Sequence, residues 1–161
     1  MQINKARIIP TAVLIGACFA FTGAAFASTA TAAVPVAITC DGLVVTDFVP
    51  AGGALFIPAN PNANNVILGT PGADWIRAGS GNDVICSLGG ADRDYGEIGN
   101  DKVFAGPGAD TLDGSLGNDR LYGQDGLDTF TCGAGVDVAN GGAGFDTADA
   151  TCEPPLVVSV P

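Results

Sequence analysis

Apolar residues are distributed differently in three parts of the chain. Residues 8–26 are mostly small and apolar and carry no charged side chain. Residues 40–68 hold short apolar runs such as GLVV, ALFI and NVIL between the turn signals CDG, PAGG and NPNANN, a pattern that predicts short strands joined by turns. From Gly69 an apolar residue returns at every ninth position with one exception. The chain therefore predicts a regular series of short elements of one repeated kind.

Nine consecutive blocks of nine residues span 69–149, and no insertion interrupts their register. Every block has Gly at its fourth position and Asp at its sixth, here called slots 4 and 6. Slot 8 is apolar in every block except the third, where it is Asp94. The blocks are GTPGADWIR, AGSGNDVIC, SLGGADRDY, GEIGNDKVF, AGPGADTLD, GSLGNDRLY, GQDGLDTFT, CGAGVDVAN and GGAGFDTAD. Chance does not produce such a series, so the sequence predicts a repeat architecture.

The blocks match the pattern G-G-x-G-x-D-x-U-x, in which U is apolar. On these residues the chain resembles the RTX (repeats-in-toxin), or hemolysin-type, calcium-binding family. The resemblance covers residues 69–149, half of the chain. It implies an all-β, right-handed parallel β-roll, that is, a β-solenoid of nine nonapeptide repeats with a small N-terminal cap. In that fold slots 1–6 form a turn, slots 7–9 form a short strand, and two blocks make one coil of about 18 residues.

The resemblance also assigns a role to the slot-6 aspartates. Calcium takes about six to eight oxygen ligands, which carboxylates and turn carbonyls supply, and glycine lets the backbone approach an ion closely. With two blocks in each coil, every slot-6 Asp lies beside the slot-6 Asp of the adjacent coil, and the expected calcium ligands form two columns. The odd blocks supply Asp74, Asp92, Asp110, Asp128 and Asp146, and the even blocks supply Asp83, Asp101, Asp119 and Asp137.

The strongly negative charge of the chain indicates that folding requires calcium. The formal net charge is −11, and after residue 27 four cations face all 17 acidic residues, which leaves −13. Adjacent coils are about 4.8 Å apart, so a column without cations is a ladder of like charges. The two columns contain seven gaps, and seven calcium ions would nearly cancel the charge. Because slot 8 provides only a thin core that ends in Ala139 and Ala148, we expect folding and calcium binding to be one event.

Asp94 departs from the pattern, because an unpaired carboxylate facing the core is costly. The preferred interpretation is a local register defect in which Tyr95 or Ile98 turns inward instead. An additional calcium ligand and an internal polar contact are the alternatives. Slots 1 and 2 also depart from glycine in several blocks, for example at Ser87 and Leu88. The third and fourth turns therefore fit the calcium pattern least well.

Four cysteines follow residue 27, and an even number in an exported chain suggests two disulfides. In the coil that the resemblance implies, Cys86 and Cys132 are 46 residues or about 2.6 coils apart, roughly 12 Å along the axis. A disulfide needs its Cα atoms within about 7 Å, and Cys132 and Cys152 are close to one coil apart. We therefore expect Cys40–Cys86 and Cys132–Cys152, one near each end of the roll.

The N-terminus has the features of a secretion signal. Lys5 and Arg7 precede the apolar stretch, and Ala25-Phe26-Ala27 offers small residues where a signal peptidase reads them. A transmembrane anchor and a lipoprotein modified on Cys18 are the alternatives. We expect a secreted, extracellular protein. Its expected parts are a signal peptide (1–27), an Ala/Thr-rich linker (28–39), an N-terminal cap (40–68), the β-roll (69–149) and a C-terminal cap and tail (150–161).

Composition narrows the classes of function. The acidic chain repels nucleic acid and anionic membranes, so we expect neither as a partner after processing. The absence of His excludes His-based triads and His-ligated zinc. The carboxylates are better explained as calcium ligands, so we expect no enzyme, with paired-carboxylate glycoside hydrolysis as the alternative.

A calcium-scaffolded binding surface is the second hypothesis for the function. On the even blocks, Phe104 and Tyr122 lie one coil apart beside Lys102 and Arg120, which suits a saccharide or a cell surface. On the odd blocks, a hydroxyl ladder of the kind that orders water in ice-binding solenoids is formed by Thr111, Thr129 and Thr147. Because Thr and aromatic residues favour strands in any case, a secreted calcium-binding protein that folds on binding is the leading prediction.

Overall fold

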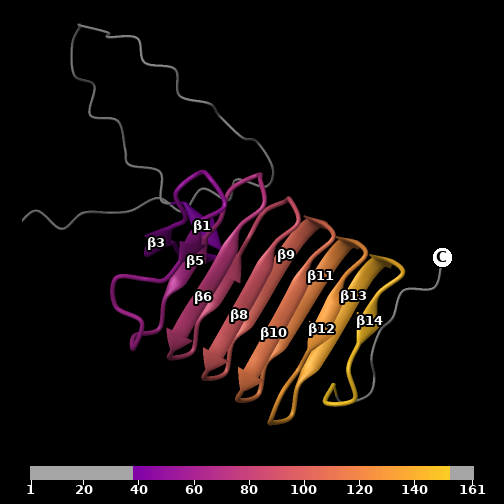
Figure 1. Ribbon diagram of the computed structural model, residues 1–161. Helices are drawn as coiled ribbons and strands as arrows, with labels where there is room; N and C mark the ends of the chain where they lie inside the picture. The colour runs from indigo at the N-terminus through magenta and orange to yellow at the C-terminus, as the bar shows by residue number, and fades with distance from the viewer. Residues whose placement is uncertain (1–37, 153–161) are drawn as a thin grey trace, which may run out of the picture.

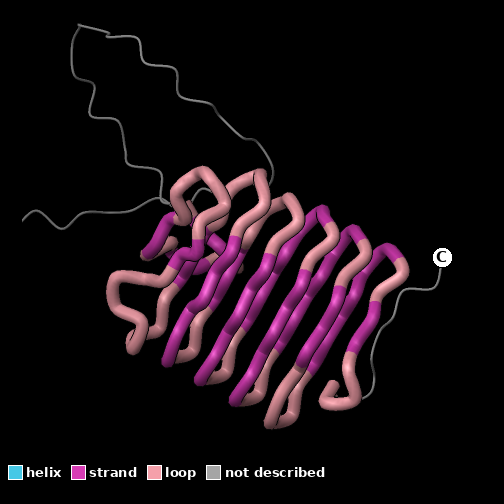
Figure 2. The backbone as a smooth tube through the Cα atoms, in the orientation of Figure 1, coloured by secondary structure: helices cyan, strands magenta, loops and turns pink. Residues whose placement is uncertain are grey.

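The computed structural model describes residues 38–152, which form a β-solenoid of stacked strands without a helix in that range. The strands form two six-stranded parallel sheets that run along the solenoid. Figure 1 and Figure 2 show the strands stacked side by side along its axis. A small antiparallel hairpin of β1 (Thr39–Cys40) and β2 (Leu43–Val44) lies at the N-terminal end. No helix among the described residues is long and apolar enough to cross a membrane. The predicted all-β roll is confirmed.

Successive strands alternate between the two sheets, so neighbours within one sheet are every second strand of the chain. The first sheet contains β3 (Asp47–Phe48), β5 (Val66–Leu68), β7 (Val84–Cys86), β9 (Lys102–Gly108), β11 (Arg120–Gly126) and β13 (Val138–Gly144). The second sheet contains β4 (Leu55–Phe56), β6 (Trp75–Ser80), β8 (Arg93–Ile98), β10 (Thr111–Leu116), β12 (Thr129–Thr131) and β14 (Thr147–Ala148). Slots 7–9 of the even blocks thus lie in the first sheet, and slots 7–9 of the odd blocks lie in the second. Several strands, such as β8 and β11, continue into the first slots of the next block, which were expected to belong to the turn.

The strand register gives the length of a coil. Thr111 pairs with Thr129, which is 18 residues later, and the same offset holds through the nonapeptide blocks. Ahead of the blocks the coil is longer, because Asp47 pairs with Ile67, which is 20 residues later. The segment that precedes Gly69 therefore already contributes three strands, β3, β4 and β5, to the two sheets.

The core is a narrow file of side chains between the sheets. The slot-8 residues from Ile76 to Ala139 are at most 1% exposed. Slot 1 points inward as well, and its small residues Ala78, Ala105 and Cys132 are fully buried. The apolar members of both slots form one continuous cluster along the solenoid axis. Each coil therefore contacts mainly its two neighbours, and stability depends on how coils stack.

Asp94 lies inside this core, so the expected register defect is wrong. Asp94 pairs in register with Leu112 and is fully buried, whereas Ile98 is 54% exposed. The reason is Ser87, which faces inward at slot 1 of the same block and donates a hydrogen bond from Oγ to Asp94 Oδ2 at 2.6 Å. Burial raises the pKa of Asp94 to about 8, although the Ser87 bond lowers it. A carboxyl that is protonated at neutral pH can remain in the core as an internal polar contact.

Both expected disulfides are present. Cys40 and Cys86 have their Cα atoms 6.0 Å apart, and Cys132 and Cys152 have theirs 4.9 Å apart. The first bond ties the β1–β2 hairpin to the first sheet, where the two pack in a second apolar cluster. The second bond ties the segment after β14 to the core. The two ends of the described solenoid are therefore covalently fixed, and each constrains the unfolded chain as well.

Candidate metal centre

The slot-6 aspartates form two columns, one for the odd blocks and one for the even blocks. Each Asp directly precedes the strand of its block, so the sheets fix where the carboxylates lie. The aspartates from Asp74 to Asp137 are at most 3% exposed, and the last one, Asp146, is half-buried. Burial of so many carboxylates in stacked coils requires a specific compensation.

From Asp83 onward, one oxygen of each column carboxylate accepts a hydrogen bond from the backbone of the preceding coil. The N–H of Asp92 donates to Oδ1 of Asp110 at 2.8 Å, and the N–H of Asp110 donates to Oδ1 of Asp128 at 3.0 Å. Equivalent bonds of 2.7–3.0 Å fill all seven gaps between slot-6 aspartates. The bond always runs from a backbone N–H to the carboxylate of the following coil, so the columns have a direction.

The second oxygen of most of these carboxylates is buried without a hydrogen-bond donor. The unpartnered Oδ2 atoms belong to Asp83, Asp92, Asp101, Asp110, Asp119, Asp128, Asp137 and Asp146. Burial raises the pKa of Asp101 to about 7 and the pKa of Asp92, Asp119 and Asp128 to about 6, and neighbouring carboxylates add to the rise while the backbone bonds oppose it. A buried carboxylate oxygen in this state needs either a proton or a cation.

Asn65 shows what surrounds that second oxygen. It stands nine residues before Asp74, in the slot-6 position of an additional, degenerate block, and its N–H donates to Asp83 Oδ1 at 2.7 Å. Its side-chain Nδ2 donates to the carbonyl oxygens of Asn60 at 3.1 Å and Ala63 at 2.8 Å, which occupy slots 1 and 4 of its block. From the repeat we infer that the unpartnered Oδ2 atoms take the position of this Nδ2 and face the slot-1 and slot-4 carbonyl oxygens of their own blocks. Such a set of acceptors suits a hard cation.

Asp74 is the exception among the column residues. Its Oδ2 accepts hydrogen bonds from the backbone N–H of Thr70 at 2.6 Å and from Thr70 Oγ1 at 3.1 Å. Thr70 stands at slot 2 of the first block, so this turn satisfies its own carboxylate. Both oxygens of the first odd aspartate thus have hydrogen-bond donors, whereas the Oδ2 atoms of the aspartates that follow have none.

No three acidic or cysteine side chains converge on one point within residues 38–152. A cation in either column would accordingly be held by one or two carboxylates together with backbone carbonyls. Calcium accepts such mixed oxygen ligands in flexible geometry, and the residues present fit it. The softer thiolate sites of zinc are excluded for the four cysteines of the described range, because all four are in disulfides.

Slot 4 is glycine because the coils approach each other most closely there. Gly99 has φ of +145°, and a Cβ at this position would lie 1.4 Å from the carbonyl oxygen of Gly81 in the preceding coil. The same approach recurs at Gly117, where a Cβ would lie 1.5 Å from the Gly99 oxygen. The slot-4 carbonyls therefore point along the column, toward the next turn.

Gly99→Ala is predicted to destabilise the calcium-loaded fold by more than about 3 kcal/mol. Two costs add up: alanine is strained at this positive φ, and its Cβ clashes with the main chain of the preceding coil. Gly72→Ala is the matched control at slot 4 of the first block. There the nearest atom to a Cβ is 3.8 Å away, so we expect a change within about 0.5 kcal/mol. Urea unfolding in excess calcium, followed by circular dichroism, measures both. Equal free energies of unfolding for the two variants would contradict the close-approach explanation.

The even turns carry a second ladder that sequence analysis missed. Asn82, Asn100 and Asn118 occupy slot 5, and the Oδ1 of each accepts a 2.8 Å bond from the slot-5 N–H of the following coil. These bonds run opposite to those of the aspartates and need no ion. Their spacing of 18 residues was the available signal. Odd blocks have Ala or a larger apolar residue at slot 5, so their turns lack this neutral support.

The two surface patterns noted in the sequence lie on outward faces of the sheets. The rings of Phe104 and Tyr122 are stacked, with centroids 4.9 Å apart and planes within 6° of each other. Thr129 pairs in register with Thr147, and their Oγ1 atoms are 3.2 Å apart within one hydrogen bond. In each pair the two side chains thus contact each other, so less of their surface is available to an external partner.

Comparison with known protein families agrees with this geometry. The family model of the RTX calcium-binding nonapeptide repeat (4 copies) matches residues 62–94, 95–130 and 131–150, more than half of the chain. The match begins before Gly69 and includes Asn65 at the head of the even column. No curated protein and no solved structure matches the chain. On the match, the coil and the aspartate columns, the chain belongs to the RTX calcium-binding nonapeptide-repeat family.

Proposed function

We propose that the two columns bind several calcium ions and that the protein folds as they bind. The observation that carries this proposal is the set of eight buried Oδ2 atoms without a donor, beside an asparagine whose Nδ2 finds two carbonyls in the equivalent position. Calcium would supply the positive charge that these oxygens lack. The proposed ligands are Asp74, Asp83, Asp92, Asp101, Asp110, Asp119, Asp128, Asp137 and Asp146, with turn carbonyls.

Coupling of binding to folding follows from the balance of forces. The narrow core buries few large side chains, and ordering a glycine-rich chain is entropically costly. Without cations, the neighbouring carboxylates of the column also raise the pKa of Asp92 and of Asp101, after burial itself. The metal-free roll therefore has little to hold it together, and binding free energy becomes folding free energy. We further propose that the protein has no catalytic activity, since its buried column carboxylates already have this structural role.

Secretion is the second part of the proposal. Residues 1–37, which include the expected signal peptide and most of the linker, and residues 153–161 lie outside the described residues. Two disulfides favour an oxidising compartment, and the lysine, arginine and small residues of the N-terminus favour export. The division into signal peptide, linker, cap, roll and tail is part of this proposal.

A calcium titration of the mature chain tests the proposed function. In chelator the protein should show a largely disordered circular dichroism spectrum. Calcium at about 0.1–1 mM, the range of extracellular modules, should induce β structure cooperatively, and calorimetry should give more than one ion per chain. Magnesium at equal concentration is the control, since it prefers rigid octahedral sites and keeps its waters. A metal-free protein that is already fully folded, or no heat of calcium binding, would overturn the proposal.

A further inference from the structure

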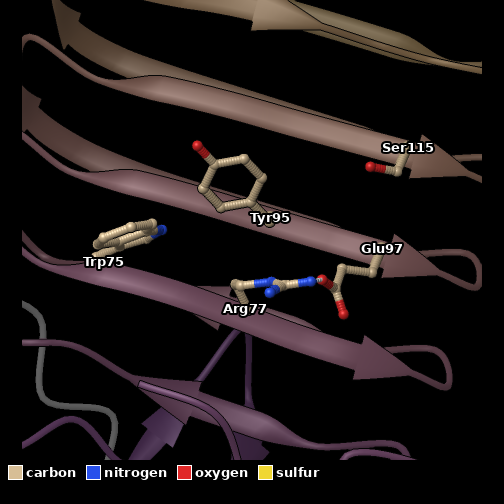
Figure 3. Close-up of a pocket in the computed structure, with 5 residues that line it drawn as sticks. All are labelled: Trp75, Arg77, Tyr95, Glu97 and Ser115. Carbon is tan, nitrogen blue, oxygen red and sulfur yellow. Dashed lines mark hydrogen bonds and ion pairs between the residues drawn. The ribbon is translucent and has the colours of Figure 1, made fainter. Parts of the chain in front are cut away.

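A groove on the outer face of the second sheet lies apart from the aspartate columns. Its volume is about 370 Å³, within the usual range of small-ligand sites. Five side chains from three neighbouring strands line it, as Figure 3 shows. They are Trp75 and Arg77 of β6, Tyr95 and Glu97 of β8, and Ser115 of β10.

One end of the groove is aromatic. Trp75 is 41% exposed although it is the largest side chain on this sheet. Figure 3 shows the Tyr95 ring broadside and the Trp75 indole nearly edge-on, so the two rings form two different walls. Among the described residues, the stacked aromatic pair is Phe104 and Tyr122, which both lie on the first sheet. In that pair each ring covers one face of the other. The rings of the groove are therefore the ones that remain open to a flat apolar surface of a ligand.

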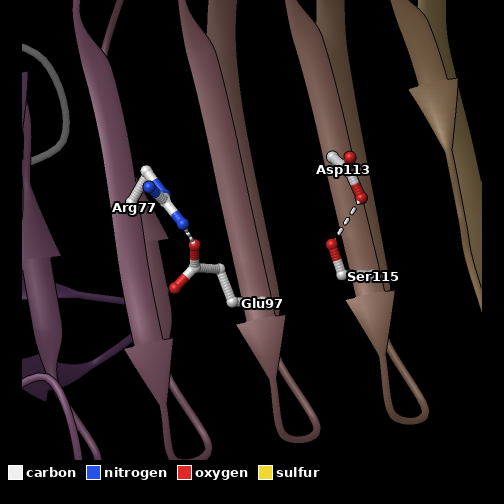
Figure 4. Close-up of polar contacts among 4 residues, drawn as sticks. All are labelled: Arg77, Glu97, Asp113 and Ser115. Carbon is white, nitrogen blue, oxygen red and sulfur yellow. Dashed lines mark hydrogen bonds and ion pairs between the residues drawn. The ribbon is translucent and has the colours of Figure 1, made fainter.

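The other end of the groove is polar but electrically balanced. The Arg77 guanidinium donates from Nε and Nη2 to Glu97 Oε1, and Ser115 Oγ donates to Oδ1 of the adjacent Asp113 at 2.8 Å, as Figure 4 shows. The ion pair cancels the charge of Arg77, so the groove does not favour a simple anion. Arg77 keeps further N–H donors and Glu97 keeps Oε2, which together suit neighbouring hydroxyl groups that both accept and donate.

Backbone strain places two of these side chains in the groove. Glu97 has φ of 76° and Ser115 has φ of 69°, at slot 2 of adjacent strands. The same slot on either side of them is glycine, namely Gly79 and Gly133, both also with positive φ. A non-glycine residue in this conformation is strained, and such residues concentrate at functional sites. Here both strained residues, Glu97 and Ser115, contribute a polar side chain to the same groove.

We propose that this groove binds a neutral oligosaccharide. The C–H face of a sugar ring packs on Trp75 and Tyr95, while vicinal hydroxyls accept from Arg77 and donate to Glu97. An extended peptide is disfavoured, because β6, β8 and β10 are interior strands with no free edge for strand addition. The site is distinct from the calcium columns and depends on them only through the fold.

Trp75 reports on the groove directly, because it is the one tryptophan of the chain. The calcium-loaded protein is titrated with cellohexaose, xylohexaose, mannohexaose and chitohexaose while tryptophan emission is recorded. We expect a saturable change with at least one of them. Glu97→Gly should weaken that binding at least tenfold, yet keep or raise the thermal midpoint, since glycine relieves the positive φ. A purely structural Glu97 would not separate binding from stability in this way.

Gln124→Gly is the matched control. Gln124 has φ of 80° at slot 2 on the first sheet, so the variant relieves the same strain away from the groove and should bind the sugar as the parent does. Circular dichroism of the same samples reports the calcium-dependent fold separately. A folded protein whose emission no hexasaccharide changes would overturn this proposal and leave the calcium proposal standing. Unaltered sugar binding by Glu97→Gly would overturn it as well.

Discussion

Asp110→Asn should weaken calcium binding and at the same time stabilise the metal-free roll. An asparagine at 110 keeps Oδ1, which accepts from the N–H of Asp92, and replaces the unpartnered Oδ2 by an amide donor. In the metal-free protein this donor can bond the slot-1 and slot-4 carbonyls, as Asn65 does. We expect a gain of about 1–3 kcal/mol, the usual cost of a buried polar group left unsatisfied. In calcium, the lost charge should lower affinity roughly tenfold, or about 1.4 kcal/mol.

Asp146→Asn is the control for this experiment. Asp146 ends its column and borders one gap between aspartates, whereas Asp110 borders two, so its effect on affinity should be smaller. Calorimetry gives the calcium affinities. Circular dichroism in chelator, with a stabilising osmolyte such as TMAO added in steps to refold the chain, gives the free energy of the metal-free state. If both variants lose stability in chelator, the second oxygen does not face carbonyls as described. If both bind calcium like the parent, the aspartates are not ligands.

Acidification should act in opposite directions on the metal-free and the calcium-loaded protein. Burial raises the pKa of Asp101 to about 7 and of Asp92, Asp119 and Asp128 to about 6, above the ordinary value of 3.8. Between pH 3.8 and about 7 the folded metal-free state then binds more protons than the unfolded state. The free energy of unfolding of the metal-free protein therefore rises as the pH falls through this window. This added stability disappears again as the pH rises.

Calcium reverses that dependence, because protons and calcium compete for the same carboxylates. At pH 8 the calcium-loaded protein should be folded and the metal-free protein disordered. As the pH falls below about 6, the calcium effect should disappear and the metal-free protein should gain β structure. Circular dichroism at fixed total calcium, repeated in metal-free buffer, measures both curves. Parallel curves would show that the column carboxylates titrate as exposed groups.

The family resemblance supplied a coil of two blocks, and the nonapeptide spacing then placed the columns. Once two blocks make one coil, the positions of Asp110, Cys132 and Cys152 relative to their neighbours follow, and the structure agrees. The burial of Asp94 could not be obtained from hydrophobicity, which treats a core carboxylate as an error. The signal was present in another form: Ser87 is the one hydroxyl residue at inward slot 1, and it lies in the same block.

Departures from the repeat carried more information than the repeat itself. Asn65 lacks the charge of an aspartate, and so it was not recognised as a slot-6 residue, although its spacing from Asp74 is correct. Glu97 and Ser115 are also departures from glycine at slot 2, and a sequence pattern does not show that their φ angles are positive. Backbone strain and side-chain direction depend on the fold, and they were therefore out of reach of spacing arguments.

The hydrogen bonds of the aspartate columns all run in one direction. The two ends of the repeat array therefore differ in how well they accept additional, duplicated blocks. At the N-terminal end, the N–H of Asn65 donates to Asp83 Oδ1 and Thr70 Oγ1 donates to Asp74 Oδ1, so the acceptors that a preceding aspartate would use are already occupied. At the other end, no side chain within residues 38–152 accepts from the N–H groups of Asp137 and Asp146. Two further blocks added there would bring the missing carboxylates and their own cation. The array is therefore suited to growth at its C-terminal end by whole coils of two blocks. Each added coil brings both its carboxylates and the cation that neutralises them.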